Sequence, residues 1–284
     1  MSGIYWLASY PKSGNTWFRI FLTNYLANGD APFDINEPMS SCSSGDSIAT
    51  PRELFESKTG LESALMTHDE IEVLQPLVFE QLALESKDDF YIKTHFACHE
   101  VSPGLPITSI KGTKGAIHIV RNPLDVALSY ADHFGTGIDN AIGELGEHDF
   151  TLCGTGHVSG KQLRQKIGSW SDHTKSWLDA RWFPVKLLRY EEMKNDPVEA
   201  FGRAIRFLGL PYDLVRLKKA IAFSDFNELK KQEQEKGFKE RSPHSSGSFF
   251  RKGGAGQWKE SLSPEQVSRI LQDHGEMMRR LGYL

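Results

Sequence analysis

The sequence is poor in cysteine, in long apolar runs and in net charge, and each shortage excludes a class of protein. Its three cysteines, Cys42, Cys98 and Cys153, are odd in number and lack the spacing of metal ligands, which favours a reducing cytoplasm. The longest uncharged stretches, residues 1–11 and 150–160, fall far short of the ~18 apolar residues of a membrane span. No basic residue precedes the first apolar run, so no secretory signal peptide is expected.

What is present indicates an ordinary globular protein. The chain has 284 residues, 39% of them hydrophobic and 25% charged, and this composition argues against a disordered, collagenous or coiled-coil chain. The 33 basic and 37 acidic residues leave a formal net charge of −4, which gives no sign of a nucleic-acid partner. The length suits one α/β domain, and we expect a single domain over residues 1–284.

Four short apolar runs predict buried strands, at residues 4–9, 90–94, 116–120 and 185–190. Each is followed, after a variable distance, by a helical pattern, and this alternation is typical of a parallel sheet flanked by helices. The expected fold class is therefore α/β with a central parallel sheet.

Three helices are indicated by an N-cap residue followed by proline, and they are expected at residues 123–134, 197–208 and 264–281. The third also has glutamine at the position that completes a capping box. By contrast, residues 135–160 and 236–256 are rich in glycine and polar residues. We expect them to form two adaptable loops, of the kind that covers an active site.

The first segment with chemical potential runs from Ser9 to Trp17, with the sequence Ser-Tyr-Pro-Lys-Ser-Gly-Asn-Thr-Trp. It joins the end of the first strand to the start of a helix, where free backbone N–H groups and the helix dipole favour a phosphate. It is not a Walker A loop, because GxxxxGK[ST] requires a first glycine and a Gly-Lys pair that are missing. On its own, the segment is more typical of a plain capped turn than of a phosphate site.

Two further segments carry cations on a similar background. Arg121 follows the third strand directly, at the sheet edge where open α/β sheets bind ligands, and Ser129, near the exposed end of the next helix, offers a hydroxyl. Residues 250–256, Phe-Arg-Lys-Gly-Gly-Ala-Gly, place two cations on a glycine-rich backbone. Two separate anion sites suggest a nucleotide that is phosphorylated at two positions.

These segments make the chain resemble the cytosolic-type sulfotransferases, which use 3′-phosphoadenosine 5′-phosphosulfate (PAPS) and release 3′-phosphoadenosine 5′-phosphate (PAP). The matches fall in family order at Tyr10–Trp17, Lys93-Thr94-His95, Arg121–Tyr130, Tyr190–Pro197 and Arg251–Lys259. Five ordered matches make a chance agreement implausible. The opening Trp-Leu-Ala-Ser-Tyr-Pro-Lys is also similar to bacterial sulfotransferases that modify natural products.

The resemblance implies a P-loop-like loop for the 5′-phosphosulfate, formed by Lys12 with Ser13, Gly14, Asn15, Thr16 and Trp17. It implies a 3′-phosphate site made of Arg121, Ser129, Arg251, Lys252 and Gly253. Trp17 and Phe226 would enclose the adenine, with Tyr190 at its edge. Each has a structural alternative: Trp17 and Phe226 as core aromatic residues, and Tyr190 as a side chain at the end of a strand. For Arg251 and Lys252 the alternative is that of solvated loop charges.

His95 is the candidate general base, because it ends the second strand directly after Lys93, at the same sheet edge as the first loop. Sulfuryl transfer requires the acceptor hydroxyl to lose a proton, and neutral imidazole is a suitable base near pH 7. Lys12, assisted by Lys93, would neutralise the charge that grows on the leaving phosphate oxygen. A lone histidine is nevertheless more often structural, and this chain has 10 of them.

Several positions depart from the family or leave alternatives open. Asn15 and Gln257 replace the commoner Thr and Asp, and the change at Gln257 is expected to loosen the C-terminal loop. The dimerisation stretch is poorly matched by Lys259 to Ser268, so either a monomer or a homodimer is possible. His95 and His99 are four residues apart, but no pattern predicts a metal site.

The acceptor is expected to be a small-molecule hydroxyl, less plausibly an amine, bound by residues 28–79 and 135–165. Partner classes that are not expected are nucleic acid and a membrane. The competing functions are an atypical P-loop kinase or hydrolase and a nucleotide-binding module that has lost catalysis.

Overall fold

The computed structural model describes residues 2–37, 51–153, 161–245, 247–250 and 253–284. Within them the chain forms two compact units. Unit one contains residues 1–10, 40–118 and 147–187, and unit two contains residues 11–39, 119–146 and 188–284. The single domain expected from the sequence stays a prediction.

A central parallel sheet of four strands, in the order β2-β1-β5-β8, gives the protein its α/β class, as predicted. The strands are β2 (Phe90–Thr94), β1 (Ile4–Ser9), β5 (Thr113–Val120) and β8 (Val185–Arg189). All six residues of β1 are buried, because this strand has a neighbour on each side and is covered on both faces. β1 and β2 are parallel, and Leu7 is opposite Lys93 while Ala8 is opposite Thr94.

Unit one buries one face of these strands against two helices. Ile4, Trp6 and Ala8 of β1 share a core cluster with Phe79 of α3 and Trp177 of α6. The Trp6 indole donates to the hydroxyl of Thr113, so its polar edge is satisfied inside the core. The remaining elements of unit one are α2 (Arg52–Thr59), η1 (Ser63–Leu65), α3 (His68–Glu85), the hairpin of β3 (Glu100–Ser102) and β4 (Leu105–Pro106), the hairpin of β6 (Thr151–Leu152) and β7 (Gln165–Lys166), and α6 (Trp170–Leu178).

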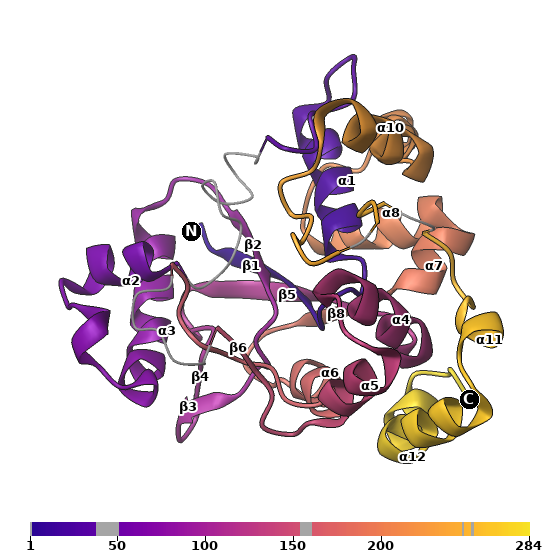
Figure 1. Cartoon of the computed structure of the whole chain (residues 1–284). Coiled ribbons are helices and arrows are strands. Elements are labelled where there is room, and N and C mark those ends of the chain that lie inside the picture. Colours follow the sequence, from indigo (N-terminus) through magenta and orange to yellow (C-terminus); the bar gives the residue numbers. More distant parts are fainter. Residues whose placement is uncertain (1, 38–50, 154–160, 246, 251–252) are drawn as a thin grey trace. The chain divides into compact units, whose positions relative to one another are not determined.

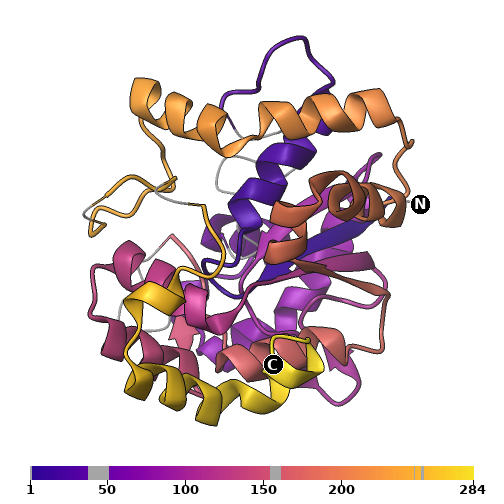
Figure 2. The ribbon, with the colours of Figure 1, turned by 90° about the vertical axis from the view of Figure 1, so that its right-hand side faces the viewer.

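Unit two is built from helices. α1 contacts α9, and α12 contacts both α4 and α5, as Figures 1 and 2 show with α12 in yellow. Phe18 and Phe21 of α1 pack against Phe201 of α8, which forms an aromatic core for this unit. The helices are α1 (Asn15–Ala27), α4 (Pro123–Phe134), α5 (Ile138–Gly146), α7 (Tyr190–Asn195), α8 (Pro197–Phe207), α9 (Leu214–Phe223), α10 (Phe226–Lys236), α11 (Trp258–Ser261) and α12 (Pro264–Arg280).

The three predicted helix starts are confirmed. The side chains of Asn122, Asp196 and Ser263 each accept a hydrogen bond from a backbone N–H in the first turn of α4, α8 and α12. Ser263 and Gln266 form the predicted capping box. The local sequence therefore fixes where these helices begin.

One loop prediction is wrong. Residues 138–146 form helix α5, and β6 follows within the same stretch. Ala141, Ile142 and Leu145 are buried at helical spacing, so this glycine-containing segment has a narrow apolar face that stabilises a helix. Within residues 237–256, by contrast, the described part has no helix or strand, which agrees with the second predicted loop.

Candidate active site

The loop between β1 and α1 is tight. Lys12 and Gly14 both have a positive φ, 69° and 102°, and a non-glycine residue in this region costs about 1 kcal/mol. Gly14 is the N-cap of α1. Glycine has no side chain that could cap the helix, and the first turn has no acidic residue. The positive end of the helix dipole is therefore not offset by a local carboxylate of the helix itself, which favours an anion at this terminus.

Arg121 joins this loop to the glycine-rich segment near the C-terminus. Its Nη1 donates to the carbonyl oxygen of Lys12 at 3.4 Å, and its Nη2 donates to that of Gly254 at 2.9 Å. The guanidinium lies over the Tyr190 ring, 4.4 Å from the ring centroid. A single buried cation thus brings together three segments that are far apart in the sequence.

Glycine is required at two of these contacts. A Cβ at Gly253 would lie 2.4 Å from Cδ2 of Phe226, and the φ of Gly253 is +57°. A Cβ at Gly14 would lie 2.6 Å from Cδ2 of Tyr190. The Tyr190 hydroxyl also donates to the Gly253 carbonyl at 3.0 Å. Both glycines allow the backbone to approach an aromatic ring more closely than any other residue could.

Trp17 and Phe226, the predicted adenine pair, are both half-buried, and one ammonium group contacts both rings. Nζ of Lys194, in α7, lies 5.4 Å from the Trp17 ring centroid and 5.8 Å from that of Phe226. The Trp17 indole donates to the carbonyl of Ser224 at 2.9 Å. The sequence did not single out Lys194, although it is the fifth residue of the Tyr190–Pro197 match.

Asp125 is a second residue that the sequence did not reveal. Beyond its favourable place in the first turn of α4, its buried carboxylate accepts from the N–H of Gly256 at 2.7 Å and from that of Trp258 at 3.1 Å. Gln257, expected to loosen this segment, donates from Nε2 to the Gly254 carbonyl at 3.1 Å. The glycine-rich segment is therefore fixed to α4 by its backbone.

The other predicted 3′-phosphate residues fare differently. Ser129 lies in the middle of α4 and not near its end, because the helix continues to Phe134, and its side chain is half-buried. Arg251 and Lys252 lie outside the described residues.

Residues of the segment 237–250 also contact the first loop. The Thr16 hydroxyl donates to Oε2 of Glu240 at 3.0 Å, and Arg19 pairs with Oε1 of Glu240 at 2.5 Å. Nζ of Lys12 lies 4.1 Å from the ring centroid of Phe249. Asn15 is buried, and its side-chain oxygen accepts from Nε of Arg19. This part of the second predicted loop, residues 236–256, is therefore a direct neighbour of α1 and of the loop that precedes it.

Buried donors in unit two fit an anionic ligand. Oγ of Ser13 and Nε of Arg121 are buried without a hydrogen-bond partner among the residues that the structure describes. Arg121 is 8% exposed and forms no ion pair with any described carboxylate. Because a buried charge without a counter-charge is costly, the arrangement favours a ligand that brings negative charge.

In unit one, His95 and Lys93 stand at the end of β2, and both are half-buried. Nδ1 of His95 lies 2.7 Å from the carbonyl oxygen of Ser9, the last residue of β1. A carbonyl oxygen only accepts, so Nδ1 carries the proton of the neutral ring and the lone pair is on Nε2. This is the tautomer that a general base acting through Nε2 needs.

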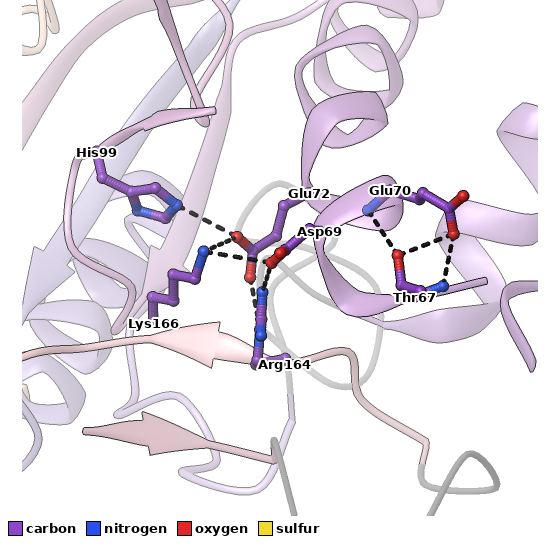
Figure 3. A network of polar contacts seen from close by, with 7 residues as sticks. All are labelled: Thr67, Asp69, Glu70, Glu72, His99, Arg164 and Lys166. Atoms are coloured by element: carbon purple, nitrogen blue, oxygen red, sulfur yellow. Dashed lines mark hydrogen bonds and ion pairs between the residues drawn. The ribbon is translucent and has the colours of Figure 1, made fainter. Parts of the chain in front are cut away.

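A charged network in unit one connects α3 to β7 and to the segment after β2 (Figure 3). The carboxylate of Glu72 is 2.8 Å from both Nε of Arg164 and Nζ of Lys166, and 3.5 Å from Nε2 of His99. Burial by itself raises the pKa of Glu72, but hydrogen bonds from these three residues outweigh it and lower the pKa to about 2. The network stabilises ionised Glu72 inside the fold.

Among the described residues, no group of His, Cys, Asp or Glu has the arrangement of a metal site. In the same part of the chain, no helix has the length and apolar character needed to cross a membrane.

A parallel sheet whose first strand leads through a tight loop into a helix places the protein in the P-loop-like α/β class. Residues 4–282 match the family model of the sulfotransferase domain, and the chain therefore belongs to the sulfotransferase family. The predicted identity as a PAPS-dependent sulfotransferase is confirmed at the level of the family.

Curated relatives agree with this assignment. The chain is 26% identical to dog sulfotransferase 1A1, over 97% of this chain and 83% of the relative. It is also 26% identical to cytosolic sulfotransferase 1 of Arabidopsis thaliana, over 93% of this chain and 75% of the relative.

Solved structures show the same fold. Mouse sulfotransferase SULT7A1, complexed with PAP, aligns with a TM-score of 0.58 and 23% identity, covering 98% of this chain and 85% of that one. Retinol dehydratase, in complex with androsterone and PAP, aligns with a TM-score of 0.59 and 16% identity, covering 97% and 80%.

The close approach of Gly253 to Phe226 leads to a binding prediction. Gly253→Ala places a methyl group against the Phe226 ring, whereas at Gly256, also at positive φ, an added Cβ would have no neighbour within 4 Å. We expect Gly253→Ala to raise the Kd for PAP at least tenfold more than Gly256→Ala does, measured by isothermal titration calorimetry. Equal effects would show that only backbone strain matters.

The Glu72 network leads to a stability prediction. Because the pKa in the folded protein lies below the usual 4.5, ionised Glu72 stabilises the fold above about pH 4.5, and this contribution is lost as the pH falls toward 2. The stability difference between the wild type and Glu72→Gln should shrink by roughly 2 kcal/mol between pH 7 and pH 3. Urea unfolding measures it, with the exposed Glu62→Gln as control. A difference independent of pH would contradict the assignment.

Proposed function

We propose that this sulfotransferase transfers the sulfuryl group of PAPS to a hydroxyl of a small-molecule acceptor. The observation that carries the proposal is the buried Arg121 guanidinium, which lacks an ion pair with any described carboxylate and bonds the carbonyls of Lys12 and Gly254. Arg121 serves the 3′-phosphate together with Ser129, Arg251, Lys252 and Gly253. Lys12 and residues 13–17 serve the 5′-phosphosulfate.

The aromatic residues serve the adenine. Trp17 and Phe226 take its two faces, and Tyr190 takes its edge. Two facts support this arrangement: both rings contact the same Lys194 ammonium, and the Trp17 ring lies edge-on to the Tyr190 ring with centroids 5.7 Å apart. The π-faces of Trp17 and Phe226 that attract the Lys194 ammonium are also the surfaces on which a nucleotide base stacks.

His95 is the general base. PAPS supplies an activated sulfuryl group, and PAP leaves when that group is transferred. Nε2 of His95 takes the proton of the attacking hydroxyl, and the Ser9 carbonyl keeps the ring in the tautomer that permits it. Lys12, assisted by Lys93, neutralises the negative charge that grows on the leaving phosphate oxygen.

The acceptor class and the cellular location are proposed from the relatives and from the composition. Retinol dehydratase binds androsterone, and this supports a small apolar alcohol as the acceptor class here. A cytosolic location is supported by the naming of the Arabidopsis relative and by the low cysteine content. A role in natural-product modification and the choice between monomer and homodimer stay predictions.

A transfer assay with radiolabelled PAPS and a panel of hydroxyl acceptors tests the proposal. We expect wild-type protein to label at least one acceptor, and His95→Ala to lower kcat by a factor of about 10² to 10⁴ with an unchanged Kd for PAP. His68→Ala, at the exposed start of α3, is the matched control and should retain wild-type kcat.

The outcomes separate the alternatives. Stabilisation by ATP and Mg²⁺ but not by PAP, measured as the shift in Tm, would favour the kinase or hydrolase. PAP binding without transfer to any acceptor would favour a module that has lost catalysis. Near-normal turnover in His95→Ala would refute the assignment of the base.

A further inference from the structure

One face of helix α6 is bonded to the backbone that follows β2. The side chains at positions 173, 176 and 177 are three and four residues apart, so they project from the same side of the helix. Each reaches a different peptide group of residues 95–98. Nε2 of His173 lies 3.1 Å from the His95 carbonyl oxygen, the Trp177 indole donates to the Phe96 carbonyl at 3.0 Å, and Oγ of Ser176 accepts from the Cys98 N–H at 2.9 Å.

These bonds begin where the sheet stops. The pairing of β2 with β1 ends at Thr94, opposite Ala8, so the peptide groups from residue 95 onward need other partners. α6 supplies three of them, and the Lys166 carbonyl in β7 accepts from the N–H of Ala97 at 2.8 Å. Residues 95–98 therefore follow the strand directly and are held by side chains of α6 and by the backbone of β7.

The chemistry of His173 makes its bond directional. The His173 ring is fully buried, and burial lowers its pKa to about 3, with the His95 carbonyl opposing this shift. The ring is therefore neutral near pH 7 and carries one proton. Because a carbonyl oxygen only accepts, that proton is on Nε2 and is donated to His95.

His95 is thereby fixed at two points. Its ring is bonded through Nδ1 to the Ser9 carbonyl, and its own carbonyl is bonded to Nε2 of His173. Together the two bonds define the rotation of the peptide that carries the ring and the direction in which Nε2 of His95 points. A displacement of about 1 Å at a reacting group can lower the rate about 10²-fold.

We propose that His173 is a positioning residue for catalysis, which acts through the backbone carbonyl of the general base His95. This inference rests on the proposed function. His173 itself transfers no proton and contacts no substrate. Ser176 and Trp177 bond the peptide groups of Cys98 and Phe96, and neither side chain bonds His95.

Amide side chains of two lengths test the proposal. Gln places its amide nitrogen close to the position of Nε2 of histidine, whereas the shorter Asn places it near Nδ1, out of reach of the His95 carbonyl. We expect His173→Asn and His173→Met to lower kcat by about 10- to 100-fold with an unchanged Kd for PAP, and His173→Gln to stay within about threefold of the wild type.

Ser176→Ala is the matched control on the same helix face. It removes the acceptor for the Cys98 N–H, three residues beyond the base, and should keep kcat within about twofold of the wild type. The Tm of every variant, measured at the assay pH, identifies any loss that follows from unfolding. Met tests the loss of the bond, and the comparison of Gln with Asn decides the question even if the Met variant does not fold.

Three results would overturn the inference: wild-type kcat in His173→Asn, equal impairment of the Gln and Asn variants, or a fall in kcat that follows Tm across all variants, including Ser176→Ala. The failure of the proposed function is distinguishable from these, because wild-type protein would then transfer no label to any acceptor.

Discussion

A buried guanidinium without a carboxylate partner among the described residues is the constraint on which unit two depends. Arg121 is 8% exposed, and among the described residues its bonded donors reach the carbonyls of Lys12 and Gly254. Backbone carbonyls satisfy hydrogen bonds but do not neutralise the charge, so the cost of burial is met only in part. The Tyr190 ring adds a further favourable contact, since its π-face is negative. A site of this kind is suited to a ligand that carries the missing negative charge.

The surrounding residues bring backbone carbonyl groups close to the Arg121 guanidinium. Glycine at position 253 lets the chain pass against Phe226, and the Asp125 carboxylate fixes the segment that follows through the N–H groups of Gly256 and Trp258. Asp125 thus stabilises the glycine-rich segment to which Arg121 is hydrogen-bonded. Asp125 does so through backbone N–H groups and forms no ion pair with Arg121. In unit one the corresponding task is orientation: carbonyl groups and a buried histidine fix His95 through its ring and its backbone.

The sequence predicted well those features that have a local cause. Buried parallel strands are continuous apolar runs, and the helix caps of Asn122, Asp196 and Ser263 depend only on residues within the first turn. α5 was missed because its apolar face is narrow and because the segment contains two glycines, Gly143 and Gly146, which are poor helix formers. The glycine-rich character of residues 135–160 was therefore a misleading signal.

The sequence led us to propose site residues where a motif names the residue, and it did not single out residues that act through another segment. Lys12, Arg121 and His95 are residues to which the family motifs assign a role. Asp125 and Lys194 lie inside two of the matched segments and His173 lies outside them, but all three are identified by contacts with residues far away in the sequence. A bond from His173 to a backbone carbonyl leaves no pattern, since every residue at position 95 has a carbonyl. Such contacts are fixed only by the fold.

The pairing of Arg121 with a 3′-phosphate is tested most directly by comparing two ligands that differ in that group alone. The ratio of the Kd for AMP to the Kd for PAP should be at least 100 in the wild type and at least tenfold smaller in Arg121→Met, because the variant removes one of the residues that serve the 3′-phosphate and the ratio cancels any general damage to nucleotide binding. A variant that retains the full preference for PAP would contradict the account.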